Sequence, residues 1–100
     1  MTDLSISERQ MLMTVVFIVE QAIRELFKPD KINLASFGNM VPHVHWHIIP
    51  RWQDDRHFPE PIWGKIHNDS PTQRPVVSDD LLMNTLSKLF SEHAIDLGEV

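Results

Sequence analysis

The sequence contains no cysteine among its 100 residues. The chain therefore cannot form disulfides, use a thiolate nucleophile or bind zinc through sulfur. No apolar run approaches the roughly 18 residues that a membrane-spanning helix requires, and no segment has the pattern of a secretion signal. We expect a cytoplasmic protein that does not bind membranes.

Basic residues are also sparse, with nine Lys and Arg, no cluster of them, and a net charge of −5. Proteins that bind nucleic acid through its backbone usually carry a basic patch, so this class is excluded. A small nucleotide is still compatible with the composition, because a few histidines, arginines and N–H donors suffice to bind one. The length predicts one small domain, residues 1–100, and a hydrophobic content of 42% allows it a core.

Three histidines alternate in the most informative stretch of the chain, His43-Val44-His45-Trp46-His47-Ile48-Ile49. The β-branched and aromatic residues between them, and the prolines at 42 and 50, predict a strand over 43–49. Strand side chains alternate between the two faces of a sheet. We therefore expect the three imidazoles on one face and the apolar side chains on the other.

Such a row of imidazoles allows three interpretations. Same-face residues lie about 6.5–7 Å apart, so His43 and His47 are too distant to share one zinc ion, whose Zn–N bonds measure about 2.0–2.1 Å. Two adjacent histidines could still bind an ion together with Asp54, His57 or His67. Alternatively, neutral imidazole, with its pKa of about 6.5, is a nucleophile for covalent catalysis. The third interpretation is a polar strand face without a function.

The stretch from Gly38 to Arg51 resembles the signature of the histidine triad (HIT) superfamily, which is His-φ-His-φ-His-φ-φ with φ apolar. The flanking segments 30–33 and 52–64 are similar to those of short bacterial members, and the resemblance covers roughly residues 4–66. It implies an α+β fold in which an antiparallel sheet is combined with a long N-terminal helix and a C-terminal helix.

The resemblance also implies a nucleotide hydrolase or transferase. The central histidine, His45, would attack the α-phosphorus of a nucleoside phosphate to form a nucleotidyl-histidine, which water then hydrolyses. His43 and His47 would hold phosphate oxygens and the leaving group. No resident metal or cofactor is implied, although a divalent metal can accompany the nucleotide. Dinucleoside polyphosphates, phosphoramidates and nucleotidyl sugars all fit this chemistry.

Four further residues are candidates for substrate binding. Asn33 matches a polar position one strand before the triad, and Gly38 and Asn39 precede the triad where the family turns between two strands. Arg51 is the nearest fixed positive charge after the triad, with a strand-end surface residue as its alternative interpretation. We expect a strand over 31–37 to pair antiparallel with the triad strand, which places Asn33 on the histidine face.

Two helices are predicted. Ser5–Glu8 and Ser7–Gln10 both fit a capping box, and the helix that follows should end at Pro29. A second helix should run from a Ser78 cap through residue 90. Residues 51–75 read as a loop-rich segment and 91–100 as a tail that is either partly ordered or flexible. The expected inward-facing residues are Met11, Leu12, Val15, Ile18, Val19, Ala22, Ile23, Leu26 and Phe27 in the first helix and Leu81, Leu82, Leu86, Leu89 and Phe90 in the second.

HIT proteins usually begin with strands that form much of the base and ribose pocket, whereas here the first helix begins within ten residues of Met1. We therefore expect a HIT-like domain without those strands. A two-stranded ribbon is marginally stable and its edges invite pairing, so we also expect a homodimer, formed with or without exchange of elements. A nucleotide-binding remnant without turnover and a histidine-based metal-binding module are the alternative functions.

Overall fold

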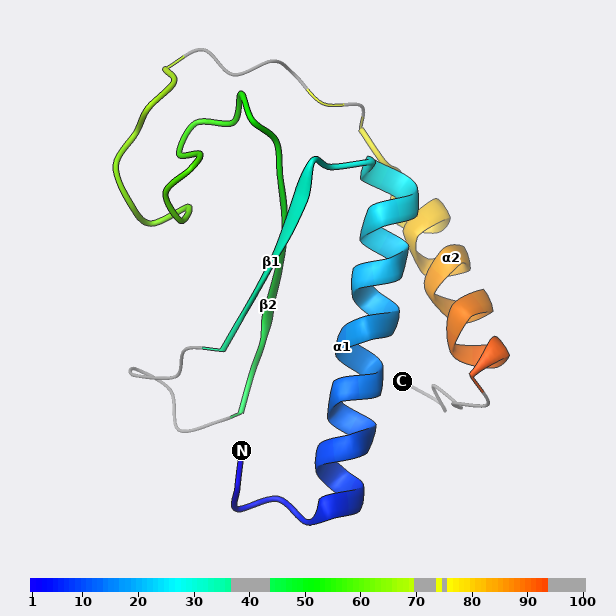
Figure 1. Ribbon diagram of the computed structural model, residues 1–100. Coiled ribbons are helices and arrows are strands. Elements are labelled where there is room, and N and C mark those ends of the chain that lie inside the picture. The colour runs from blue at the N-terminus through cyan, green and yellow to red at the C-terminus, as the bar shows by residue number, and fades with distance from the viewer. Residues whose placement is uncertain (37–43, 70–73, 75, 94–100) are drawn as a thin grey trace.

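The computed structural model describes residues 1–36, 44–69, 74 and 76–93. The elements follow the order α1 (Ile6–Phe27), β1 (Lys31–Ala35), β2 (His47–Arg51) and α2 (Asp79–Glu92). Figure 1 shows α1 between the β1–β2 ribbon on one side and α2 on the other. The predicted α+β class is confirmed. Within the described part of the chain, no helix is both long enough and apolar enough to cross a membrane.

Helix α1 begins at one of the two predicted capping boxes. The Ser5 hydroxyl accepts a hydrogen bond from the Glu8 backbone N–H at 3.1 Å, and the Glu8 carboxylate accepts one from the Ser5 N–H at 2.8 Å. This second bond lowers the pKa of Glu8. The helix ends at Phe27 because Pro29 disfavours a helical conformation for Lys28, which adopts a left-handed φ of 47°.

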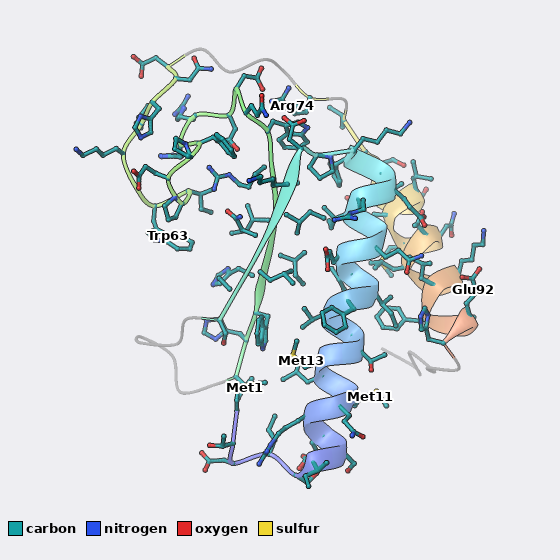
Figure 2. The ribbon with its side chains drawn as sticks, in the orientation of Figure 1. Met1, Met11, Met13, Trp63, Arg74 and Glu92 are labelled. Carbon is teal, nitrogen blue, oxygen red and sulfur yellow. The ribbon has the colours of Figure 1, made fainter. Side chains whose placement is uncertain are left out.

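The core lies between the two helices, where Ile18 and Ala22 of α1 pack with Leu89 and Phe90 of α2. Two predicted inward-facing residues are more exposed than expected. Met11 is exposed because α1 extends past the end of α2 at this level (Figure 2). Leu81 is exposed because Leu82, about 100° further around α2, lies closer to the inward side.

The ribbon is antiparallel, with Lys31 opposite Arg51 and Ala35 opposite His47. The prediction of a strand over 43–49 was wrong in its bounds, because β2 begins at His47 and continues to Arg51. Pro50 lies inside β2, opposite Ile32, instead of ending the strand. Proline is tolerated in a strand without a neighbour on its other side, because no hydrogen bond from its nitrogen is needed there. Within the described residues, β2 pairs only with β1.

The two faces of the ribbon have different surroundings. Residues 52–69 form an irregular loop on the side of the ribbon away from α1 (Figure 1). Arg51, the first residue of the expected loop-rich segment 51–75, still belongs to β2. The side chain of Arg51 reaches this loop, so the odd-numbered residues of both strands face it and the even-numbered ones face α1. Residues 91 and 92 of the expected tail still belong to α2, and residues 94–100 lie outside the described part of the chain.

Candidate active site

Two of the three triad histidines are described, and their rings are in contact. The ring centroids of His45 and His47 are 5.5 Å apart, and the rings meet edge to face at 84°. His47 is exposed and His45 is half-buried. The expectation that these two imidazoles lie together is therefore met. His43, Gly38 and Asn39 lie outside the described residues, so their predicted roles stay predictions.

The main chain of His45 is attached to the end of β1, although β2 itself begins two residues later. The hydroxyl of Ser36, which directly follows β1, donates a hydrogen bond to the carbonyl oxygen of His45 at 2.8 Å. This bond fixes the backbone of the predicted nucleophile relative to the neighbouring strand. The sequence analysis did not assign a role to Ser36.

Asn33 lies on the same face of the ribbon as His47. It pairs with Ile49 across the ribbon, and residues 47, 49 and 51 share its face. The predicted antiparallel pairing and the predicted face of Asn33 are both confirmed. The Asn33 side-chain oxygen accepts a hydrogen bond from Arg51 at 2.7 Å. Since a guanidinium only donates, the amide nitrogen of Asn33 must be the atom turned away from Arg51.

Arg51 is neither a surface residue nor an open positive charge, because only 2% of it is exposed. Its guanidinium donates two hydrogen bonds to the Asp55 carboxylate, at 2.7 and 3.1 Å. It donates two more, to Asn33 at 2.7 Å and to the carbonyl oxygen of Glu60 at 2.6 Å. The Phe58 ring lies 5.6 Å from the guanidinium carbon. In this structure Arg51 connects both strands to the loop, and Asp55 balances its charge.

Asp55 is the centre of the first turn of the loop. Its carboxylate accepts hydrogen bonds from the backbone N–H groups of Trp52, His57 and Phe58 at 3.0, 3.1 and 2.7 Å. The hydrogen bond from Arg51 lowers the pKa of Asp55 well below its ordinary value, and the backbone N–H groups act in the same direction against the effect of burial. The sequence analysis gave Asp55 no role, because Arg-x-x-x-Asp in a non-helical segment has no characteristic pattern.

The residues proposed as partners in a metal site lie elsewhere in the loop. The Nδ1 atom of His57 is 3.1 Å from the carbonyl oxygens of Gly64 and Lys65, so it carries the proton. His67 lies 3.9 Å from the Glu60 carboxylate. Among the described residues, no three His, Asp or Glu side chains are arranged to hold a metal ion.

A family model of the HIT domain matches residues 1–54, which is more than half of the chain. The chain belongs to the HIT family. This match includes the triad stretch, in which the rings of His45 and His47 are in contact. The resemblance of the sequence to this family is thereby confirmed.

Two curated HIT hydrolases are similar to this chain in alignments of 58 positions that cover 53% of its length. The bis(5'-adenosyl)-triphosphatase of Saccharomyces cerevisiae is 34% identical there. The asymmetrical bis(5'-nucleosyl)-tetraphosphatase of Schizosaccharomyces pombe is 41% identical. The matched segments make up only 28% and 32% of these two proteins.

Solved HIT structures resemble the chain over most of its length. A histidine triad protein from Bradyrhizobium japonicum superposes with a TM-score of 0.61 at 34% identity, over 90% of this chain and 63% of that protein. One from Marinobacter aquaeolei gives 0.60 at 32% identity, over 91% and 61%. The HIT fold is therefore shown, and this chain spans less than two thirds of either structure.

Proposed function

We propose that this chain is a HIT-type nucleotide hydrolase in which His45 is the nucleophile. The contact between the rings of His45 and His47, with His47 exposed on the face of β2 that is turned away from α1, carries this proposal. Membership of the HIT family supports it, as does the similarity to two enzymes named for the dinucleoside polyphosphates they act on.

The reaction proceeds in two substitutions at the α-phosphorus. A ring nitrogen of His45 attacks phosphorus, a P–N bond forms, and the bond to the leaving group breaks with its electron pair going to the leaving group, which takes up a proton. Water then attacks the nucleotidyl-histidine, the P–N bond breaks and the imidazole is regenerated. The products are a nucleoside monophosphate and the protonated leaving group, with one water consumed.

The neighbouring groups suit this chemistry. Phosphoryl substitution depends on positioning and charge stabilisation more than on complex covalent chemistry. His47 presents an exposed imidazole within ring contact of His45, where its N–H can donate to a phosphate oxygen. The bond from Ser36 holds the backbone of His45 on the ribbon, so the nucleophile stands on a fixed element.

Intact-protein mass spectrometry during turnover of adenosine 5'-phosphoramidate tests this proposal. We expect the wild type to gain the mass of an adenylyl group and to release AMP, and His45→Ala to do neither. His67→Ala is a matched control, because this partly exposed loop histidine has no role in the proposed reaction. Turnover and adduct formation by His45→Ala would contradict the assignment. A wild type that binds AMP but neither forms the adduct nor turns over would indicate a nucleotide-binding protein instead.

A further inference from the structure

Asn33 lies between two residues that are diagonal to it on the neighbouring strand. It is directly opposite Ile49, and Arg51 and His47 are the residues two positions to either side of Ile49. All four side chains share the face of the ribbon that is turned away from α1. Diagonal neighbours in an antiparallel pair are about 7–8 Å apart, which is within reach of long and aromatic side chains. Asn33 therefore lies between a buried cation and an exposed imidazole.

The amide of Asn33 is held in one orientation. Its oxygen accepts a hydrogen bond from the Nη1 atom of Arg51 at 2.7 Å, and a guanidinium can only donate. Exchanging the oxygen and the nitrogen of the amide would place two donors against each other, so Arg51 determines which end of the amide faces it. The two N–H donors of Asn33 are consequently directed away from Arg51. Because Asn33 is only half-buried, part of its side chain stays open to a ligand.

Arg51 cannot bind a substrate directly. Only 2% of the residue is exposed, and the Asp55 carboxylate balances its charge through two hydrogen bonds. The guanidinium also donates to the carbonyl oxygen of Glu60 at 2.6 Å, which fixes it from the side of the loop. Any effect of Arg51 on a bound nucleotide must therefore pass through another side chain. Asn33 is the side chain of β1 that accepts its hydrogen bond.

An amide at position 33 offers chemistry that bracing alone does not need. A carboxylate of the same shape would bond the guanidinium at least as well and would add an opposite charge. It would, however, present only acceptors and a negative charge to a ligand, whereas the amide presents N–H donors and no charge. Such donors beside an imidazole suit a ligand that is rich in negatively charged acceptors. Phosphate oxygens are acceptors of this kind.

We propose that Arg51 is a positioning residue, which orients the Asn33 amide so that its N–H donors bind the phosphate oxygens beside His47. This inference rests on the proposed function and adds a positioning residue to it. The charge of Arg51 itself stays with Asp55. Arg51 thus acts on the affinity for phosphate through Asn33 and not by direct contact.

Asn33→Asp separates orientation from bracing, because the two side chains have the same shape. The new carboxylate keeps the hydrogen bond from Arg51 but has no N–H donor. We expect its stability in urea to be no lower than that of the wild type. Its calorimetric affinity for AMP and for ribose 5-phosphate should fall by about 10- to 150-fold, the usual effect of losing a hydrogen bond to a charged group. Asn84→Asp, the same change at an exposed position of α2, is the matched control and should bind both ligands normally.

Arg51→Lys tests the positioning itself. Lysine keeps a positive charge for Asp55, but it is a point charge without the planar fork that holds the amide. We expect this substitution to weaken AMP binding several-fold in the wild-type background. In an Asn33→Ala background it should have no further effect on AMP binding, since Arg51 acts through the amide that is then missing.

Each other outcome would overturn a stated part of the argument. Unchanged AMP affinity in Asn33→Asp, in a protein whose wild type forms the adenylyl adduct, would refute the positioning role and leave the hydrolase intact. So would a difference from wild type that disappears at high ionic strength, because salt screens charge repulsion but does not restore a donor. So would a loss for AMP without one for ribose 5-phosphate, which would place the partner of the amide on the base.

The Arg51→Lys results decide the remaining cases. No effect on AMP binding in the wild-type background, or an equal effect with and without Asn33, would show that Arg51 does not act through this amide. A wild type that binds neither ligand and forms no adduct would refute the proposed function together with this inference.

Discussion

Replacing Arg51 with methionine should strongly destabilise the ribbon and its loop. Methionine is similar in length and apolar, so the buried volume is largely kept while four hydrogen bonds are lost. The oxygens of Asn33 and Glu60 lose their donor, and the carboxylate of Asp55 loses its counter-charge. The effect therefore comes from uncompensated polar groups and not from a cavity.

The magnitude follows from the burial of the pair. Removing one partner of a buried, hydrogen-bonded ion pair typically costs about 3–5 kcal/mol. The side chain of Asp55 is 19% exposed and keeps three backbone N–H donors, so the loss should be near the lower limit, about 3 kcal/mol. Domains of this size unfold with a free energy of roughly 5–15 kcal/mol, so the substitution should remove a large share of the total stability. The melting temperature should fall by roughly 10–25 °C.

Urea denaturation followed by circular dichroism measures this loss, and Arg24→Met is the matched control. Arg24 forms a salt bridge with Glu20 at 3.6 Å, also at a spacing of four residues, but its side chain is 69% exposed. Exposed pairs on helices contribute about 0.3–0.5 kcal/mol, so the same substitution should change little there. If Arg51→Met were no more destabilising than Arg24→Met, the role that we assign to the buried guanidinium would be wrong.

Three further predictions concern the same structure. The hydrogen bond from Arg51 lowers the pKa of Asp55 in the folded state. The ionised Asp55 carboxylate therefore contributes its full stabilisation above the ordinary Asp pKa of about 3.9, and this stabilisation is lost as the pH falls below that value. When the free energy of unfolding is measured against acid pH, Asp55→Asn should show less of this loss. Ser36→Ala removes the bond to the His45 carbonyl, so turnover should fall while stability drops by only about 1 kcal/mol. Phe90→Ala should destabilise the interface between α1 and α2 by about 3–5 kcal/mol in a thermal melt.

The helices could be predicted because their signals are local. The Ser5–Glu8 capping box and the Ser78 cap each specify a helix start within four residues, and both are used. Burial was harder to predict, since it depends on how far the two helices overlap. Met11 carries the same periodic signal as Ile18, yet only Ile18 has α2 packed against it.

The bounds of the triad strand could not be predicted, because they depend on pairing. Pro42 and Pro50 look equivalent in the sequence, and both were interpreted as ends of the strand. Pro50 is tolerated inside β2 because its nitrogen has no required acceptor, which only the arrangement of neighbouring strands decides. The role of Arg51 was hidden for a similar reason, since its partners come from β1 and from two turns of an irregular loop.

The position of Arg51 on the histidine face links the stability of the ribbon to its chemistry. Arg51 and Asn33 are diagonal neighbours across the two strands, and their hydrogen bond requires the observed register. A slip of one residue would turn the apolar side chains towards the loop. It would also leave the guanidinium on the apolar side, away from Asp55. The buried ion pair therefore penalises a one-residue slip, which would turn His47 towards α1.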